Sequence, residues 1–248
     1  MTFNQRSYEA ELLDNEDIPT EDLFQNLREL DFINHWLGGH SVVLDGIKYF
    51  INSKKINNSE ISINNDISNI SENIFIYEIG SGGGDNLRAI GYFLDKKKVS
   101  HKLGGVDLKE DCVRFAENFQ PKKHPINYQI ADYQLSTFTE SKPDIIFNSL
   151  FCHHFKDEEL IKMLQWMHQN ATIGFLIADL HRHPLAYYSI LWLTQLFSKS
   201  YLVKNDAPLS VLRGFSRKEW IALLEKAGIE NYKIKWKWAF RWLILVEK

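Results

Sequence analysis

Cysteines, excess basic charge and long apolar runs are all scarce in this chain of 248 residues. The two cysteines, Cys112 and Cys152, form neither a CxxC pair nor a disulfide framework, which indicates a reducing compartment and gives no sign of cysteine-bound zinc. The 29 Lys and Arg against 32 Asp and Glu leave a net charge of −3, so the chain lacks the basic field that supplies much of the affinity for nucleic acids. We therefore expect a small-molecule partner and no nucleic acid.

No segment predicts secretion or insertion into a membrane. Residues 1–17 are polar and acidic, whereas a signal peptide begins with basic residues followed by an apolar stretch. The most apolar window, 185–197, is shorter than the ~20 residues of a bilayer span and contains Ser189, Thr194 and Gln195. We expect a cytoplasmic protein whose mature chain starts at residue 1, with no integral membrane segment and with a buried or lid helix over 185–197.

The first 72 residues predict two helices followed by a linker. Thr20 can cap a run in which apolar residues recur at helical spacing until Gly38, and Ser41 can cap a second run through Phe50. From residue 51 to 72 the composition changes to Asn, Ser and Ile without a sustained period. We predict an N-terminal helical cap over 1–50 and an Asn/Ser-rich linker or loop over 51–72.

From residue 73 onward, apolar runs typical of strands alternate with helical patterns. Strands are predicted at 73–79, 102–108, 126–131, 144–150 and 173–178, and helices at 87–94, 111–119 and 157–168. Such alternation requires crossover connections, which bury a parallel sheet between layers of helices. The fold class is therefore α/β with a doubly wound sheet.

The C-terminal third ends the predicted sheet with a different pattern. Ser216 and Glu219 have capping-box spacing before a helix that Gly228 ends. Residues 232–238 alternate between apolar and lysine side chains, and 241–246 give one more apolar run. Because these two segments are close in sequence, we predict an antiparallel pair, which makes the sheet seven-stranded and mostly parallel with an antiparallel last strand.

The strongest local signal is the glycine-rich turn EIGSGGGDN, residues 78–86, placed where a strand gives way to a helix. Glycines allow positive φ angles and close approach of the backbone to a ligand, and the helix start offers free N–H groups. A dinucleotide-binding GxGxxG pattern would need a third glycine at Asp85, whereas Gly80, Gly82 and Gly84 give GxGxG. The turn predicts a nucleotide-like ligand and disfavours a nicotinamide cofactor, although a nicotinamide-dependent oxidoreductase stays as the first alternative.

At this turn the sequence resembles the class I S-adenosylmethionine-dependent methyltransferases, whose first motif is an acidic residue followed by GxGxG. Three further motifs follow in the same order: Asp107 at the end of the second strand, 131–133 after the third, and 144–150 as the fourth. The resemblance covers 73–248 and implies a Rossmann-like methyltransferase fold with a lid insertion over 181–214, S-adenosyl-L-methionine as cofactor, Asp107 on the ribose hydroxyls and Asp132 near the adenine. The cofactor-binding residues that it implies are Glu78, Gly80, Ser81, Gly82, Gly84, Asn86, Asp107, Leu108, Asp132, Tyr133 and Asn148.

Two features of the sequence depart from the family pattern. The step from Glu78 to Asp107 is longer than usual, which we attribute to a surface loop at 95–98. After the fourth strand the chain reads Asn148-Ser149-Leu150-Phe151, not the NPPY-type segment of the members that methylate adenine or glutamine amines. Methylation of nucleic-acid bases is therefore not expected.

The acceptor side of the reaction calls for a proton acceptor when a hydroxyl is methylated. Methyl transfer is an in-line displacement in which alignment supplies much of the rate and a base helps. His153 and His154 follow the fourth strand, and His181 and Arg182 follow the fifth, at the sheet edge where open α/β folds bind ligands. We expect these four residues to face the acceptor. The histidine pairs lack the i, i+4 spacing that marks a metal site, so no metal is predicted.

The insertion at 181–214 indicates a lid. Related methyltransferases that act on small aromatic, quinone or polyketide-like molecules cap their site here, and SLFCHHF and NDAPLS are similar to segments of a bacterial subgroup near the ubiquinone/menaquinone biosynthesis methyltransferases. An apolar lid excludes water and shapes the acceptor pocket. We expect methyl transfer to a small, fairly apolar acceptor (phenolic, quinol or polyketide-like), with oxygen favoured over carbon. A non-catalytic module that keeps the cofactor cleft is the second alternative.

Overall fold

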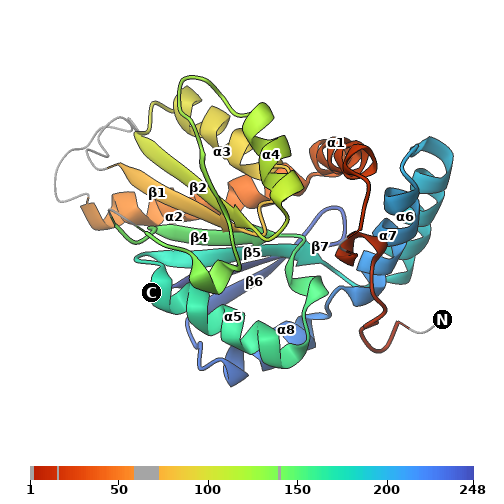
Figure 1. Cartoon of the computed structure of the whole chain (residues 1–248). Helices are drawn as coiled ribbons and strands as arrows, with labels where there is room; N and C mark the ends of the chain where they lie inside the picture. The colour runs from red at the N-terminus through yellow and green to blue at the C-terminus, as the bar shows by residue number, and fades with distance from the viewer. Residues whose placement is uncertain (1–2, 16, 59–72, 139–140) are drawn as a thin grey trace.

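A computed structural model describes residues 3–15, 17–58, 73–138 and 141–248, and their strands form one sheet with the order β3-β2-β1-β4-β5-β7-β6 (Figure 1). The first five strands are parallel, and β7 runs antiparallel to both of its neighbours. The predicted fold class is thus confirmed. The strands are β1 (Ile74–Ile79), β2 (His101–Asp107), β3 (Asn127–Ile130), β4 (Ile145–Ser149), β5 (Gly174–Leu180), β6 (Tyr232–Lys237) and β7 (Arg241–Glu247).

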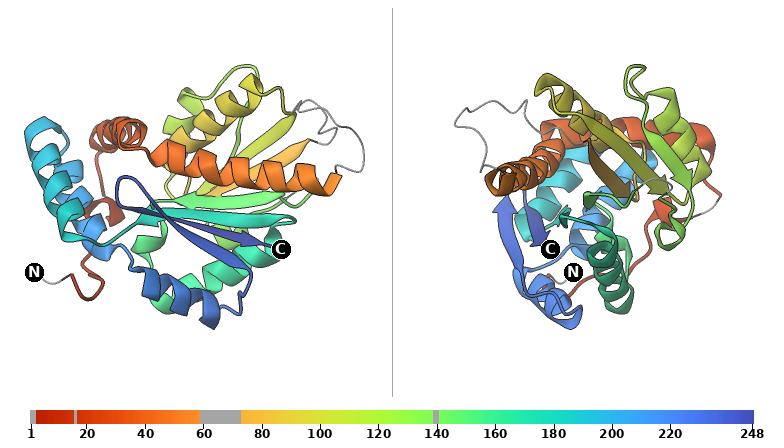
Figure 2. Two further views of the ribbon diagram at one scale, coloured as in Figure 1. Left: turned by 180° about the vertical axis from the view of Figure 1, so that it is seen from behind. Right: turned by 90° about the vertical axis from the view of Figure 1, so that its left-hand side faces the viewer.

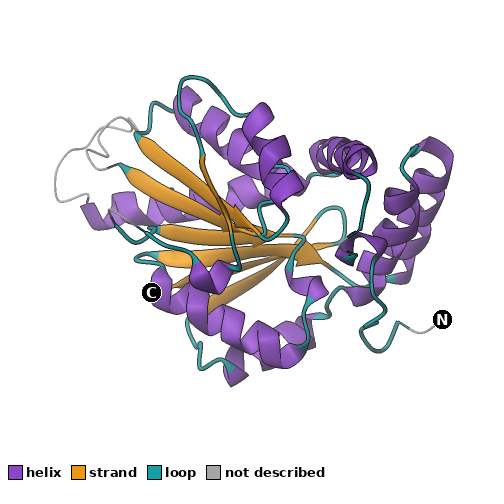
Figure 3. Cartoon of the chain, in the orientation of Figure 1, coloured by secondary structure: helices purple, strands orange, loops and turns teal. Residues whose placement is uncertain are grey.

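Helices cover both faces of this sheet (Figure 3). On one face lie α2 (Gly39–Asn58), α3 (Asp85–Lys96) and α4 (Glu110–Asn118), and on the other lie α5 (Asp157–Asn170) and α8 (Arg217–Lys226). The central strand β1 shows why both layers are needed: Ile74 and Ile76 pack into the core on the α2 and α3 side, whereas Phe75, Tyr77 and Ile79 pack toward α5 and α8. Because successive side chains point to opposite faces, a continuous apolar strand must be covered twice.

Three further helices gather at the end of the sheet to which the parallel strands point. They are α1 (Thr20–Trp36), α6 (Pro184–Phe197) and α7 (Tyr201–Arg213), and the N-terminal segment with its short 3₁₀ helix Leu12–Asp14 lies against α7 (Figure 1). This group covers the edge where open α/β sheets bind their ligands. No helix in the described part of the chain has both the length and the hydrophobicity needed to cross a bilayer.

The N-terminal helices begin and end differently from the prediction. Thr20 is the first residue of α1 rather than its cap, and its hydroxyl donates to Asp111 Oδ2 at 2.8 Å. The second helix, α2, begins at Gly39, so Ser41 lies inside its first turn. It also continues to Asn58, because the apolar face that includes the buried Ile51 keeps its contact with the core, and Figure 2 shows it running along the sheet. The predicted linker is therefore wrong for 51–58, and its part at 59–72 lies outside the described residues.

The C-terminal predictions fit more closely. Ser216 Oγ accepts from Glu219 N at 3.3 Å, and Glu219 Oε2 accepts from Ser216 N at 2.6 Å, which completes the predicted capping box. Gly228 follows α8 with a φ of 74°. The lid differs, because sequence analysis places one helix in it and the structure has two, α6 and α7, with Pro208 inside the second.

Candidate functional site

The glycine turn between β1 and α3 has a backbone that only glycine adopts easily. Gly80, Gly82 and Gly84 have φ angles of 67°, 48° and 72°. A Cβ on Gly80 would lie 2.3 Å from the ring of Phe151, and one on Gly84 would lie 2.2 Å from the Tyr128 hydroxyl. At Gly82 a Cβ would meet no described atom within 4 Å. The turn is thus packed tightly at its two ends and open at its centre, which leaves the backbone N–H groups near Gly82 within reach of a ligand.

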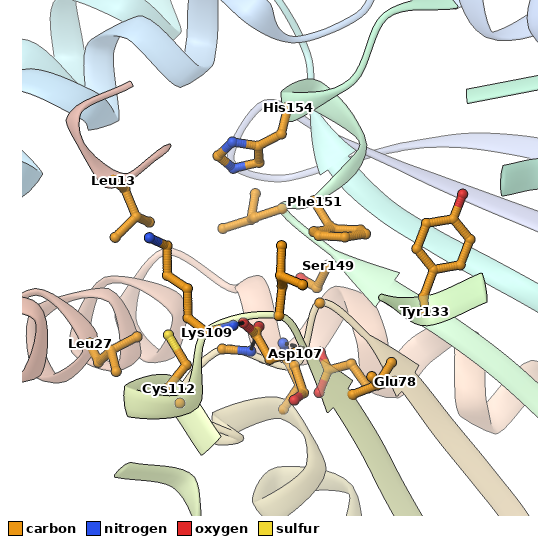
Figure 4. A pocket seen from close by; sticks show the side chains of 18 of the residues that line it. Leu13, Leu27, Glu78, Asp107, Lys109, Cys112, Tyr133, Ser149, Phe151 and His154 are labelled. Atoms are coloured by element: carbon orange, nitrogen blue, oxygen red, sulfur yellow. Dashed lines mark hydrogen bonds between the residues drawn. The ribbon is translucent and has the colours of Figure 1, made fainter. Parts of the chain in front are cut away.

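A cavity of about 420 Å³ lies over this turn, at the carboxyl ends of β1, β2 and β4 (Figure 4). All the predicted cofactor residues except Gly84 and Asn148 line it. Nine residues from three segments of the chain are thus brought to one site: Glu78, Gly80, Ser81, Gly82, Asn86, Asp107, Leu108, Asp132 and Tyr133.

The two exceptions have structural roles. Gly84 caps α3 in the left-handed conformation and packs against Tyr128. Asn148 is fully buried in β4, where its Nδ2 lies 3.6 Å from Met167 Sδ and its Oδ1 accepts from Cys152 Sγ. Since side chains alternate along a strand, Asn148 points to the α5 layer, and the next residue, Ser149, lines the cavity instead.

Asp107 ties the ends of β1 and β2 together below the cavity. Its Oδ2 accepts from Gly82 N at 2.8 Å, and its Oδ1 accepts from Lys109 N at 3.0 Å. Burial raises the pKa of the Asp107 carboxyl, and the two backbone N–H groups lower it. Each carboxylate oxygen keeps a further lone pair, so the group can still accept from two ligand hydroxyls.

Oxygen atoms without protein partners surround the same cavity. Glu78 Oε1 accepts from Asn86 Nδ2 at 3.1 Å, whereas Glu78 Oε2, Asn86 Oδ1, Ser81 Oγ and Ser149 Oγ are buried without a hydrogen-bond partner among the described residues. Burial raises the pKa of Glu78 well above its usual value, and Asp85 and Asp107 raise it further. A ligand that carries positive charge and hydrogen-bond donors would satisfy these atoms. This set of oxygens therefore fits S-adenosylmethionine, whose ammonium and sulfonium groups are cationic and whose ammonium and ribose hydroxyls are hydrogen-bond donors.

Part of the cavity wall comes from residues that sequence analysis missed. Leu13 and Asp14 belong to the N-terminal segment, and Leu27, Leu30 and Asn34 belong to α1. The apolar stripe of α1 was visible in the sequence, but nothing in the pattern shows which residues it covers. Only the packing of α1 against α4 and α7 places this stripe over the glycine turn.

A second cavity of about 370 Å³ adjoins the first, and Leu13, Leu30, Leu150 and His154 line both. Its wall is mostly apolar and comes from α1, α6, α7 and the turn between β6 and β7. The lid and N-terminal helices thus enclose a space next to the glycine-turn cavity, as expected of an acceptor site.

His153, His154 and Glu11 lie next to one another in the wall of the second cavity. The Nδ1 atoms of the two histidines pair with Asp179 Oδ1 at 2.8 Å and Asp14 Oδ1 at 2.9 Å. Their Nε2 atoms lie 3.7 Å from Glu11 Oε1 and 3.9 Å from Glu11 Oε2, beyond hydrogen-bond length. Because carboxylates accept from Nδ1–H, each neutral ring carries its lone pair on Nε2, the atom suited to accept a proton.

Glu11 is a residue that sequence analysis did not select. It is buried, and Ser210 Oγ donates to its Oε1 at 2.9 Å. Burial raises its pKa to about 7, although His154 and Arg213 lower it. With the two histidines it forms a group of side chains that can also hold a cation, within 4.8 Å of one another. Arg213 Nε lies 3.8 Å from Glu11 Oε1, and this positive charge favours proton transfer over cation binding.

His181 and Arg182 are not brought to this group, and neither lines either cavity. The guanidinium of Arg182 donates to the carbonyls of Phe3 and Gly214 and to both carboxylate oxygens of Glu219. His181 Nδ1 accepts from Trp236 Nε1 at 3.2 Å. A β-bridge between His181 and Phe215 holds this segment against the start of α8, so we keep the catalytic hypothesis for His153 and His154 only.

Comparisons with known proteins agree with this geometry. Residues 77–186 match the family model of a methyltransferase domain. A comparison of the sequence with curated proteins finds no match. Among solved structures, human N-acetylserotonin methyltransferase in complex with SAM is similar, with 17% identity and a TM-score of 0.60 over 93% of this chain, which spans only 56% of the human chain.

Two further solved structures match over most of their own length. Magnesium protoporphyrin IX methyltransferase (ChlM) from Synechocystis PCC 6803 with bound SAH has 12% identity and a TM-score of 0.51 over 85% of this chain and 84% of its own. The plantazolicin methyltransferase BpumL in complex with a triazolic desmethylPZN analog and SAH has 16% identity and a TM-score of 0.55 over 90% of this chain and 99% of its own. Residues 77–186 therefore contain a methyltransferase domain, and the described chain has the fold of methyltransferases solved with SAM or SAH bound.

Proposed function

We propose that this protein is an S-adenosylmethionine-dependent methyltransferase, and that it transfers the methyl group to a hydroxyl oxygen of a small, fairly apolar acceptor, phenolic, quinol or polyketide-like, held in the second cavity. One observation carries the proposal: His154 lines both cavities, and its Nε2 has no hydrogen-bond partner among the described residues. The similar structures are named for acceptors as different as N-acetylserotonin and plantazolicin, so the acceptor class is argued from this chain's own cavity.

The residues of the first cavity would hold the cofactor, which supplies an activated methyl group on its sulfonium. Asp107 would accept from the ribose hydroxyls, Asp132 would lie near the adenine, and the unpaired oxygen of Glu78 would face the ammonium of the amino-acid part. Leu13, Leu27 and Leu30 would keep water away from the cofactor.

The residues at the wall between the cavities would handle the acceptor proton. His154 Nε2 would accept it, Asp14 would hold the ring in orientation through Nδ1, and His153 with Asp179 would form a second pair of the same kind. Oxygen is favoured over carbon because a hydroxyl offers a proton directly to this pair of nitrogens. Glu11, whose two carboxylate oxygens lie within 4 Å of the two Nε2 atoms, would exchange the proton with them.

A turnover assay with a panel of phenols and quinols tests this function. Mass spectrometry would show addition of one methyl group, and NMR of the product would show whether oxygen or carbon carries it. Melting curves with S-adenosylmethionine and with nicotinamide nucleotides separate the oxidoreductase alternative, since the bound cofactor raises the melting temperature. If the protein binds S-adenosylmethionine but methylates no acceptor in the panel, the non-catalytic module is the better description.

A further inference from the structure

The wall of the second cavity contains a buried positively charged side chain, Arg241, at the start of β7. Arg241 is 4% exposed, and its hydrogen bond to Asn34 Oδ1 is long, at 3.4 Å from Nη2. Its Nε and Nη1 have no hydrogen-bond partner among the described residues. Burial lowers the pKa of Arg241 to about 10, which leaves the guanidinium charged at neutral pH. An unpaired buried charge is unfavourable, so this position calls for a further partner.

The nearest carboxylates are already occupied. Asp179 and Asp85 act on Arg241 through their charge, but neither forms an ion pair with it in the described part of the chain. Asp179 accepts from His153 and from Leu180 N, and Asp85 pairs with His40 at 2.8 Å. The positive charge of Arg241 is therefore offset only by carboxylates that are not in contact with it and that have other hydrogen-bond partners. Its guanidinium can still bind an anion directly.

The two cavities differ in the kind of polar atom that lacks a partner. Around the first cavity the unpartnered buried atoms are oxygens, as described above for Glu78 and its neighbours. In the wall of the second cavity they are nitrogen donors: Arg241 Nε and Nη1, and Nδ2 of Asn26, which is 2% exposed. Two carboxylates in the same wall already have partners: Asp206 accepts from Leu12 N and Leu13 N, and Glu11 accepts from Ser210 Oγ and lies 3.8 Å from Arg213 Nε. The second cavity thus has spare donors and a cation, which suit a ligand with negatively charged oxygens.

We propose that the acceptor carries a carboxylate, and that Arg241 binds this group while the hydroxyl to be methylated lies toward His154. This inference rests on the proposed function and narrows the acceptor class to hydroxy acids whose remaining structure is apolar. Arg241 is a specificity-determining residue in this scheme and takes no part in the proton transfer. A guanidinium binds a carboxylate through charge-assisted hydrogen bonds, which a neutral amide of the same shape cannot replace.

The proposed contact between Arg241 and the acceptor carboxylate can be tested with matched pairs of hydroxybenzoates and hydroxybenzamides, including pairs with an alkyl substituent. Binding of each compound to the protein saturated with S-adenosylhomocysteine is measured by calorimetry. We expect the wild-type protein to bind each acid ~10-fold or more tightly than its amide. The Arg241→Gln variant should lose this preference and keep its affinity for the amide within about twofold, and Arg241→Lys should keep part of the preference.

Lys237→Gln is the matched control. Lys237 is the register partner of Arg241 in the β6–β7 pair, but it forms its ion pair with Asp45 at 2.8 Å and does not line the cavity. This variant should keep the full preference for acids. Should Arg241→Gln fail to fold, the wild-type comparison and Arg241→Lys still decide the question.

Three results would overturn the proposed contact between Arg241 and the carboxylate. They are equal affinity of the wild-type protein for acid and amide, a preference for acids that survives in Arg241→Gln, or no acid bound in any pair. Failure of the proposed function looks different, because acids would then bind with the expected preference and yet not be methylated.

Discussion

The backbone N–H of Gly82 donates to Oδ2 of Asp107 at 2.8 Å, so the glycine turn after β1 and the carboxylate that ends β2 form one structural unit. The bond explains why both motifs are needed. Asp107 holds the turn in the left-handed conformation at Gly82 and at the same time presents its remaining lone pairs to the cavity. Cofactor binding and the shape of the turn are therefore coupled.

Replacing Asp107 with Ala should weaken binding of S-adenosylhomocysteine by ~1.5–3 kcal/mol, the effect of losing a charged hydrogen-bond partner. The melting temperature should fall as well, because Gly82 N and Lys109 N lose their acceptor. Calorimetry and thermal unfolding measure the two effects. Asp95→Ala, which removes a surface carboxylate paired with His124, is the control and should leave both unchanged. Unaltered cofactor affinity in Asp107→Ala would refute the ribose assignment.

Replacing His154 with Ala should lower turnover by ~10²-fold or more, since general-base catalysis contributes that much, and should leave the affinity for S-adenosylhomocysteine nearly unchanged. Steady-state kinetics with an acceptor from the panel measures the first, and calorimetry the second. His181→Ala should affect turnover far less, because His181 lies outside both cavities. Equal losses in the two variants would contradict the placement of the base at the shared wall.

Glu11 should make stability depend on pH. Its pKa is raised to about 7 in the folded protein, above the usual value near 4.5, so the folded state binds its proton more tightly than the unfolded state does. The contribution to stability is then full below pH ~4.5 and is lost as the pH rises through 7, a change of about 3 kcal/mol. Denaturant unfolding of wild type and Glu11→Gln at several pH values isolates this effect. A stability difference that stays constant between pH 5 and 8 would exclude the shifted pKa.

Gly84→Ala should destabilise the protein more than Gly82→Ala. Both positions have positive φ, but only at Gly84 would the new Cβ meet a buried atom, the Tyr128 hydroxyl at 2.2 Å. The cost at Gly82 should be that of the backbone conformation, ~1–2 kcal/mol. Adding Tyr128→Phe should recover part of the stability of Gly84→Ala and none of that of Gly82→Ala. Chemical denaturation of the four variants measures this, and the absence of any recovery would show that the clash does not set the cost.

Local patterns in the sequence are sufficient to predict the features that depend on neighbouring residues. The continuous apolar run of β1, the glycine turn that follows it and the capping box at Ser216 are local patterns, and each forms where the sequence predicts it. The family resemblance then indicated the cofactor class and nine of the residues that line the first cavity. These succeeded because backbone conformation and strand burial follow from short-range sterics and periodicity.

Tertiary structure alone decided the acceptor side. Glu11, Asp14 and Arg241 reach the cavities from segments far from His153 and His154 in the chain, and no spacing rule relates them. The sequence predicts Arg182 as a site residue, but in the folded protein its guanidinium donates to Glu219 and to backbone carbonyls. Which polar groups are left without a partner is fixed only when all elements pack together, and for that reason the charge of the acceptor could be argued from the folded protein and not from its sequence.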